Sequence, residues 1–234
     1  MPEPARAAAP AHQTVIAIDG PAASGKSSTA QWVAKRLGFS HVDSGALYRA
    51  LTAVALRRSS ADAWTEALVL AGGGVVALVP DGGSFVPTLD GQRADDEIRG
   101  AAVTQHVSLV ARMHRVRAWV NEQVRHTAAA CDVVVDGRDM GTAVFPNAQL
   151  KVFLVADPWE RARRRLLQRL SRSPTDEEIA EETDRLVQRD AGDSTQTVQA
   201  VDAVLIDTTY LTQVEQVERI VALAKAVSHR GDAT

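Results

Sequence analysis

The chain has 234 residues and a mass of 25.0 kDa. With 45% hydrophobic and 24% charged residues, it is not disordered or fibrous, and one α/β domain with insertions fits this length best. The net charge of −3 argues against a general nucleic-acid binder, and the single cysteine, Cys131, excludes an intrachain disulfide and fits a reducing compartment.

The first segment of the chain predicts no structure. Residues 1–13 contain three prolines and no continuous apolar run, so we expect a flexible tail and not a secretory signal. No later stretch is apolar enough to span a membrane. We therefore expect a cytoplasmic monomer, with neither a membrane nor a nucleic acid as its partner.

Strands alternate with helices from residue 14 onward. Short apolar segments predict five buried strands, at residues 14–19, 41–43, 131–136, 150–156 and 203–207. Helical periodicity predicts helices at residues 27–37, 46–58, 63–70 (capped by Asp62), 96 to about 130, 159–172 and 212–227. A further acidic helix that includes residues 176–184 is expected after a cap at Ser173 or Thr175. Residues 75–79 and 85–89, around a Pro-Asp-Gly-Gly turn, predict an antiparallel hairpin. The pattern favours an α/β fold: a five-stranded parallel sheet with helices on both faces and a small β-containing insertion.

A phosphate-binding loop follows the first strand. Residues 20–27 read GPAASGKS and match G-x-x-x-x-G-K-[ST]. In this pattern backbone N–H groups surround phosphates, Lys26 reaches the β- and γ-phosphate oxygens, and the Ser27 hydroxyl can bind Mg²⁺. ATPases, GTPases and small-molecule kinases all share it. The expected nucleotide-binding residues are Gly20, Pro21, Ala22, Ala23, Ser24, Gly25, Lys26, Ser27 and Ser28.

The second strand ends in a segment that suits an acceptor site. Residues 43–49 read DSGALYR, and Arg49 can hold a phosphate through a bidentate contact. An N-cap at Ser44 with a solvent-facing arginine explains this segment, taken alone, somewhat better.

The third strand is followed by residues 136–142, which read DGRDMGT. Here Arg138 can meet a phosphate, and Asp139 can accept a hydrogen bond from an exocyclic amine. Asp136, at the strand tip, can act through Mg²⁺-bound water. The alternative is a tight turn with an internal Arg–Asp pair.

The segment 159–193 pairs a basic helix with an acidic one. Four of its arginines fall on one side of the first helix, at about 100° per residue, namely Arg161, Arg165, Arg169 and Arg172. Ser173 or Thr175 can cap the acidic helix that follows. A solvated pair held by ion pairs explains most of these charges. A mobile lid that brings positive charge to a transferring phosphoryl group is the functional alternative. RNA binding is a third interpretation, which the acidic run opposes.

Together these segments resemble the bacterial cytidylate kinases, a family of P-loop nucleoside monophosphate kinases, from about residue 14 to 227. The motifs that carry the resemblance are GPAASGKS (20–27), DSGALYR (43–49), DDEIR (95–99), Ser108 with RVR (115–117), DGRDMGT (136–142), FLVA-x-x-x-x-RARRR (153–165) and RD-x-x-D (189–193). The resemblance implies that ATP phosphorylates CMP or dCMP in the presence of Mg²⁺. It also implies a P-loop NTPase-type core at 14–45, 131–158 and 194–230, an acceptor-binding insertion at 46–130 and a lid at 159–193, in one kinase domain over 14–230.

The resemblance further implies a role for individual residues. Ser27 is the expected metal ligand, and the expected catalytic residues are Lys26, Arg138, Arg161 and Arg165. The expected CMP-binding residues are Ser44, Tyr48, Arg49, Ser108, Arg117, Arg138, Asp139, Arg189 and Asp193. Of these, Ser108 and Arg117 suit the O2/N3 acceptor edge of cytosine and Asp139 suits its N4 amine, whereas uracil reverses the N3 and N4 roles. Arg189 and Asp193 are expected to face the ribose.

One position departs from the pattern of this family. An arginine usually follows RD-x-x-D, but here Gln196 occupies that place and no arginine occurs from 190 to 218. Either Arg161 or Arg165 supplies the charge, or catalysis is weaker. Two alternatives stay open: a P-loop kinase for another small acceptor such as UMP, and a catalytically silent nucleotide-binding regulator, which only Gln196 favours.

Overall fold

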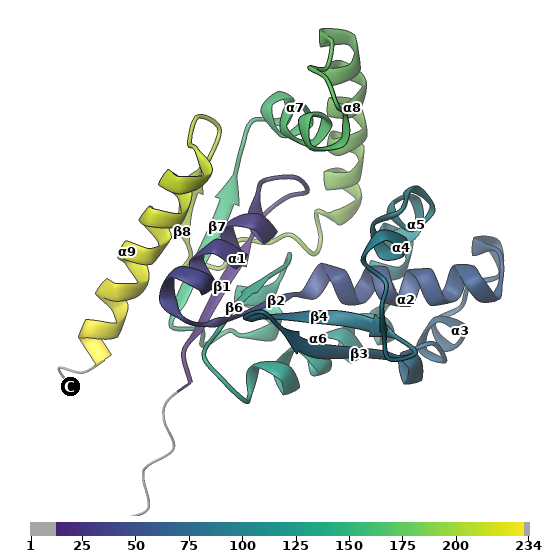
Figure 1. Cartoon of the computed structure of the whole chain (residues 1–234), viewed down its shortest axis with the longest axis horizontal. Helices are drawn as coiled ribbons and strands as arrows, with labels where there is room; N and C mark the ends of the chain where they lie inside the picture. Colours follow the sequence, from purple (N-terminus) through teal and green to yellow (C-terminus); the bar gives the residue numbers. More distant parts are fainter. Residues whose placement is uncertain (1–12, 232–234) are drawn as a thin grey trace, which may run out of the picture.

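The computed structural model describes residues 13–231 and has one mostly parallel sheet between helices (Figure 1). All but one residue of the predicted tail lie outside the described residues. The strand order is β3-β4-β2-β6-β1-β7-β8, with β5 paired to β4. The strands are β1 (Val15–Asp19), β2 (Ser40–Asp43), β3 (Val76–Asp81), β4 (Ser84–Leu89), β5 (Gln92–Arg93), β6 (Val133–Asp136), β7 (Leu150–Val155) and β8 (Val204–Asp207).

The predicted parallel core is confirmed. β2, β6, β1, β7 and β8 are neighbours in that order, and every pair among them is parallel. The predicted hairpin is formed by β3 and β4, which pair antiparallel. Because β4 also pairs in parallel with β2, the hairpin extends the core sheet.

Helices surround this sheet and supply most of the described chain. They are α1 (Lys26–Leu37), α2 (Ser44–Arg58), α3 (Glu66–Leu70), α4 (Asp95–Arg99), α5 (Ala101–Ala111), α6 (His114–Ala128), α7 (Pro158–Arg169), α8 (Asp176–Asp193) and α9 (Gln213–Gly231). The helical stretch predicted from residue 96 is divided at Gly100 and near Met113, which have extended backbone conformations. None of the helices within residues 13–231 is long and apolar enough to cross a bilayer.

Alternate residues of the strands build two cores, one on each face of the sheet. Ile16 and Ile18 of β1 pack in the core covered by α1 and α9, whereas Ala17 packs in the core covered by α2, α5 and α6. This follows from the two-residue period of a strand. Each buried isoleucine contributes roughly 1.5–3 kcal/mol to stability.

Side-chain caps fix where the helices begin. The Asp43 carboxylate, and not the predicted Ser44 hydroxyl, caps α2 by accepting from the Ala46 amide at 3.1 Å. Thr65, and not the predicted Asp62, caps α3. Thr175 caps α8, as predicted, and forms a capping box with Glu178.

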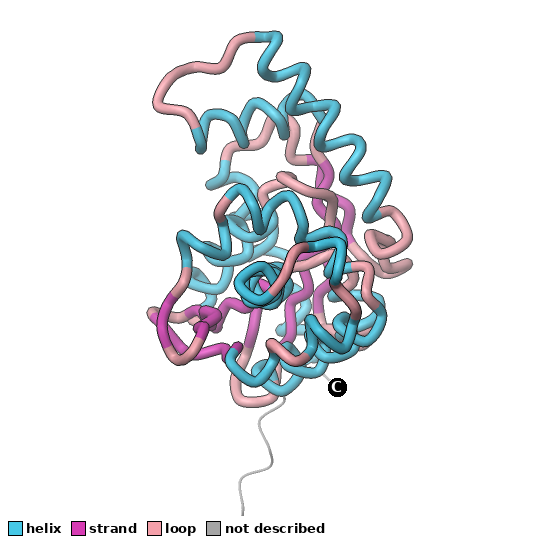
Figure 2. The backbone as a smooth tube through the Cα atoms, turned by 90° about the vertical axis from the view of Figure 1, so that its right-hand side faces the viewer, coloured by secondary structure: helices cyan, strands magenta, loops and turns pink. Residues whose placement is uncertain are grey.

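Helices α7 and α8 form a hairpin that stands beyond the end of β7 (Figure 1). The view turned by 90° also shows it projecting above the rest of the chain (Figure 2). The hairpin has a small apolar core of its own, formed by Ala162, Leu166, Ile179 and Leu186 together with Ala22 of the phosphate-binding loop. We call α7, α8 and their connection the arginine hairpin.

Candidate functional site

The three strand ends that carry polar motifs, those of β1, β2 and β6, lie side by side. β6 lies between β2 and β1, and Asp136 at its tip is in register with both Asp43 and Ile18. The segments that follow these strands therefore share one edge of the sheet. This is the edge at which α/β folds bind their ligands.

The phosphate-binding loop turns sharply between β1 and α1. A Cβ atom at Gly20 would collide with the Leu154 carbonyl oxygen of β7, so this position requires glycine. Gly25 has a φ of 90° and begins α1. Ala23 has a left-handed conformation with a φ of 58°, which is costly for a residue other than glycine. The surrounding contacts must therefore hold this loop in its conformation.

Lys26 is buried within this loop. Its ammonium donates to the Pro21 carbonyl oxygen at 2.6 Å and to the Ser24 hydroxyl at 3.4 Å. Burial lowers the pKa of Lys26 well below its usual value, and the positive charges of Arg138 and Arg189 lower that pKa further. The predicted phosphate-binding lysine is thus within electrostatic reach of arginines from two other motifs.

The first residues of α1 also contact the third strand. The Ser27 hydroxyl donates to the Asp136 carboxylate at 2.6 Å, and His41 bonds the other oxygen of the same carboxylate at 2.7 Å. Burial lowers the pKa of His41, but the hydrogen bond and charge of Asp136 outweigh it, so this pKa is raised. A hydroxyl beside a carboxylate is a donor set that fits Mg²⁺, which prefers oxygen ligands and retains water.

A pocket opens next to this loop, between α2, α5, α6 and the end of α8. It encloses about 520 Å³, part of which is open to solvent. All nine residues predicted to bind CMP line it. The lining also includes Gly45, Val107, Ala111, Gly137 and Gln196.

One wall of the pocket holds Arg117 in a fixed orientation. Its guanidinium donates to the Asp139 carboxylate, to the Ala111 carbonyl oxygen at 3.0 Å and to the Gln196 side-chain oxygen at 3.2 Å. The guanidinium also lies 5.7 Å from the centre of the Tyr48 ring. The donor groups of Arg117 and the acceptor oxygens of Asp139 therefore lie side by side in the pocket. The edge of a nucleobase also has donors and acceptors side by side, so these residues suit hydrogen bonding to a base.

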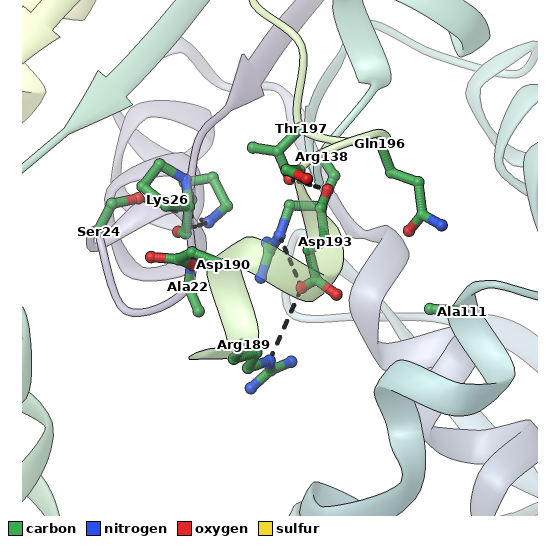
Figure 3. A network of polar contacts seen from close by, with 12 residues as sticks. Ala22, Ser24, Lys26, Ala111, Arg138, Arg189, Asp190, Asp193, Gln196 and Thr197 are labelled. Atoms are coloured by element: carbon green, nitrogen blue, oxygen red, sulfur yellow. Dashed lines mark hydrogen bonds and ion pairs between the residues drawn. The ribbon is translucent and has the colours of Figure 1, made fainter. Parts of the chain in front are cut away.

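The opposite wall gathers positive charge. Arg138 and Arg189 both face Asp193, at 3.7 Å and 3.8 Å (Figure 3). Burial lowers the pKa of Arg189 to about 10, and the positive charges of Arg138, Arg49 and Arg165 contribute to this lowering. Arg49, Arg138, Arg165 and Arg189 thus lie near one another, and Asp193 lies between Arg138 and Arg189. Such a concentration of positive charge favours binding of a polyanion.

Several polar atoms of this pocket have no hydrogen-bond partner among residues 13–231. They are the Tyr48 hydroxyl, Nε of Arg138, Nε of Arg189 and Oδ1 of Asp193. Buried polar atoms are normally paired, so such a cluster indicates a ligand site.

The two predicted catalytic arginines of the hairpin lie in different surroundings. Arg165 bonds Glu182 at 2.9 Å, and its charge acts on Arg49 and Arg189. Arg161 is buried, with 4% of its surface exposed, and bonds Asp190 and the backbone of the phosphate-binding loop. Arg161 is thus engaged by Asp190 and the loop, whereas the charge of Arg165 contributes to the lowered pKa values of two pocket arginines.

Four polar residues of the site make contacts that the motif analysis did not predict. The Asp19 carboxylate accepts from the amides of Met140 and Gly141, at 2.9 Å and 2.7 Å, and so holds the segment after β6. Burial raises the pKa of Asp19 to about 6. The other three are His41, Asp190 and Gln196. A polar residue at the end of a buried strand is a detectable signal for Asp19, while the other three depend on how distant elements pack.

Comparisons with known proteins show the family of this chain. The family model described as cytidylate kinase matches residues 16–226. Cytidylate kinase from Geobacillus kaustophilus is 44% identical over 213 residues, which cover 89% of this chain and 95% of that protein. Cytidylate kinase from Limosilactobacillus fermentum is 42% identical over 212 residues, which cover 88% and 92%. Among solved structures, shikimate kinase from Bacteroides thetaiotaomicron has a TM-score of 0.46 at 15% identity, with 91% and 98% covered. The chain belongs to the cytidylate kinase family.

Proposed function

We propose that this chain transfers the γ-phosphoryl group of ATP to CMP or dCMP and releases ADP with CDP or dCDP. The observation that carries the proposal is that Asp136 joins the two sites. Its carboxylate accepts from Ser27 of the phosphate-binding loop at 2.6 Å, and its carbonyl oxygen accepts from Ser44 of the acceptor pocket at 2.8 Å. Arg138 and Arg189 line the same pocket, and their positive charges contribute to the lowered pKa of Lys26. Donor and acceptor phosphates would therefore meet in one cationic region, as direct transfer requires.

The acceptor base would be selected by the wall around Arg117. Cytosine presents O2 and N3 as acceptors and its N4 amine as a donor. Arg117 and Ser108 would donate to the first two, and Asp139 would accept from the third. Uracil carries a proton on N3 and an acceptor at position 4, so Asp139 would face an oxygen and disfavour it. Arg189 and Asp193 would contact the ribose.

Phosphoryl transfer would depend on positioning and charge. The acceptor phosphate is the nucleophile, and Arg49 and Arg138 would orient it for in-line attack. Lys26 and Arg165 would stabilise the negative charge on the transferring group. Ser27 would bind Mg²⁺ with Asp136 beside it, and the bound ion supplies further charge neutralisation on the phosphate oxygens.

The chain would divide into three functional parts. The core would bind ATP, the insertion at 46–130 would bind the acceptor, and the arginine hairpin would close as a lid that excludes water. A monomer in the cytoplasm stays our prediction. Light scattering behind size exclusion tests the first part of it.

A coupled ADP-release assay tests the proposed reaction. ATP and Mg²⁺ are supplied with CMP, dCMP, UMP, AMP or dTMP in separate reactions. We expect turnover to be fastest with CMP and dCMP. Faster turnover with UMP would keep the kinase but overturn the roles of Ser108, Arg117 and Asp139. Binding of ATP without turnover of any acceptor would favour a silent nucleotide-binding protein.

A further inference from the structure

A closed ring of hydrogen bonds joins the phosphate-binding loop to both helices of the arginine hairpin. The Ala22 amide donates to one oxygen of Asp190 in α8 at 3.1 Å. The Ala22 carbonyl oxygen accepts from Arg161 of α7 at 2.8 Å. Arg161 in turn donates to the other oxygen of Asp190 at 2.6 Å. Both polar groups of one loop residue are therefore held by a single ion pair, in which Arg161 is buried and Asp190 is partly buried. Ala22 and Asp190 lie on the same side of Lys26 in Figure 3.

Apolar packing reinforces the ring. The Ala22 side chain is 3% exposed and belongs to the apolar core of the hairpin, with Leu166 and Leu186. Ala23 packs against the same core and has the left-handed backbone conformation described above. The first half of the phosphate-binding loop is thus built into the base of the hairpin. A shift of α7 or α8 at this point would either break the ring or move the loop.

The ring and its neighbour also engage two of the three nitrogens of the Arg161 guanidinium. Its Nη1 serves both Ala22 and Asp190, and its Nε donates to the Ala156 carbonyl oxygen at 3.1 Å. The negative charge of Asp190, 2.6 Å away, compensates the positive charge of Arg161. The charge of Arg165, one helical turn further on, contributes to the lowered pKa values of Arg49 and Arg189.

We propose that Arg161 and Asp190 are positioning residues, which hold the phosphate-binding loop in its ATP-binding conformation through Ala22. The inference rests on the proposed function, since it assumes that this loop binds ATP. Asp190 would thus support ATP binding without contacting a phosphate, since its negative charge would repel the phosphate oxygens. The preceding residue, Pro21, supplies the carbonyl oxygen that Lys26 contacts, so displacement of Ala22 would also displace Lys26.

Two substitutions and their combination test the ring. Asp190→Asn keeps the shape of the side chain and removes its charge, Arg161→Gln removes the guanidinium, and the double variant removes both. Equilibrium binding of the fluorescent analogue mant-ATP is measured without any acceptor, and the KM values for ATP and CMP are measured separately.

We expect Asp190→Asn and Arg161→Gln each to weaken mant-ATP binding on the order of tenfold, the scale of a lost charge-assisted hydrogen bond. The KM for ATP should rise in parallel, while the KM for CMP stays within about twofold. The double variant should bind mant-ATP about as weakly as the weaker single variant, because both changes break the same ring.

Arg163→Gln is the matched control. Arg163 lies on the same helix, has a half-exposed side chain and pairs only with Glu160 at 3.3 Å among the described residues. We expect its nucleotide binding to equal that of the unaltered protein. Thermal melts followed by circular dichroism identify any variant that does not fold, in which case the isosteric Asp190→Asn variant carries the test.

Three outcomes would overturn the proposal. If Asp190→Asn binds mant-ATP normally, the ring does not position the loop. If the effects of the single variants on binding add in the double variant, the two residues act independently and not through one ring. If Arg161→Gln lowers kcat while binding is unchanged, Arg161 acts on the phosphoryl group directly. Because binding is measured without turnover, a failure of the proposed kinase reaction would leave this test intact.

Discussion

The hydroxyl of Ser27 donates a hydrogen bond of 2.6 Å to the carboxylate of Asp136, a residue 109 positions further along the chain. This contact joins the first turn of α1 to the tip of β6. It exists because β1 and β6 are parallel neighbours, so the segments that follow them emerge at the same edge of the sheet. The contact places a hydroxyl and a carboxylate at the end of the phosphate-binding loop, whose buried lysine is the subject of the first prediction.

Replacement of Lys26 by methionine should abolish most of the activity and preserve the fold. Methionine fills a similar volume without the ammonium that donates to the Pro21 carbonyl oxygen. We expect kcat to fall on the order of 10²–10³-fold, as for the loss of one preorganised donor. The thermal midpoint should not fall, because a buried charge is removed.

The matched control is Lys35→Met, at an exposed position in the last turn of the same helix. Its kcat in the coupled assay should be unchanged. Equal losses in the two variants would mean that the Lys26 effect arises from α1 as a whole and not from the phosphate-binding loop.

Replacement of Asp139 by asparagine should change the base preference. An asparagine amide can donate to O4 of uracil, whereas the carboxylate accepts from N4 of cytosine. We expect the ratio of kcat/KM for CMP to that for UMP to fall at least about tenfold. Asp184→Asn, exposed on α8, is the control. An unchanged ratio in Asp139→Asn would remove Asp139 from base selection.

The polar strand ends could be predicted from the sequence because of the parallel topology. Once β1, β2 and β6 are recognised as strands, their following segments must share one edge, whatever the details of packing. The phosphate-binding loop, Arg49, Arg138 and Asp139 follow from this argument. Ser108 and Arg117 do not, because they lie on α5 and α6, and only the family resemblance suggested them.

The contacts within the arginine hairpin could not be predicted in the same way. Arg161 and Arg165 lie on one side of α7, and both were expected to reach a phosphate. Their surroundings differ because α8 presents Asp190 to the first and Glu182 to the second. Which carboxylate meets which arginine depends on the rotation of two helices about their axes. The sequence pattern alone does not determine that rotation.

The pair formed by His41 and Asp136 should make stability depend on pH. The pKa of His41 is raised in the folded protein by Asp136, so its protonated form stabilises the fold. That contribution is fully present below the unfolded pKa of about 6.5 and is lost as pH rises through the folded pKa. In urea unfolding, the stability difference between the unaltered protein and His41→Asn should therefore be larger near pH 6 than at alkaline pH.

His114 supplies the control for this prediction. It is the first residue of α6 and is exposed, and within residues 13–231 it forms no hydrogen bond or ion pair with Asp136. His114→Asn should shift stability by a similar amount at both pH values. A difference between the unaltered protein and His41→Asn that stays constant with pH would contradict a protonated His41 in the fold.

Glu182 should be required for the stability of the arginine hairpin. It is 3% exposed and pairs with Arg165, Arg169 and Arg185, at 2.9, 3.7 and 3.3 Å. Glu182→Gln leaves these arginines without their shared charge partner. Because the arginines are partly exposed, we expect a loss of about 2 kcal/mol in the free energy of unfolding, below the cost of a fully buried pair.

Glu181→Gln is the matched control, since Glu181 is 69% exposed in its side chain and pairs only with Arg185 in the described part of the chain. Its effect should stay within about 0.5 kcal/mol. If Glu182→Gln and Glu181→Gln lose equal stability, the buried ion pairs of Glu182 do not account for its effect. The loss would then come from the lower helix propensity of the substituted residue.

Gln196 should act on the acceptor and not on the transferring phosphoryl group. Its side-chain oxygen accepts from Arg117 at 3.2 Å, and it lines the same pocket as Asp139. Gln196→Ala removes one of the groups that orient Arg117. We expect the KM for CMP to rise about threefold to tenfold, the scale of one neutral hydrogen bond, with kcat unchanged.

Gln196→Arg distinguishes this role from that of a missing catalytic arginine. A second guanidinium at this place would repel Arg117 and compete for Asp139, so the KM for CMP should rise further. Gln199→Ala is the control, because Gln199 is exposed and bonds only the Ala203 carbonyl oxygen among residues 13–231. A large increase of kcat in Gln196→Arg would instead mean that this chain lacks a positive charge that phosphoryl transfer needs. An unchanged KM in Gln196→Ala would mean that Asp139 and the Ala111 carbonyl oxygen orient Arg117 without help.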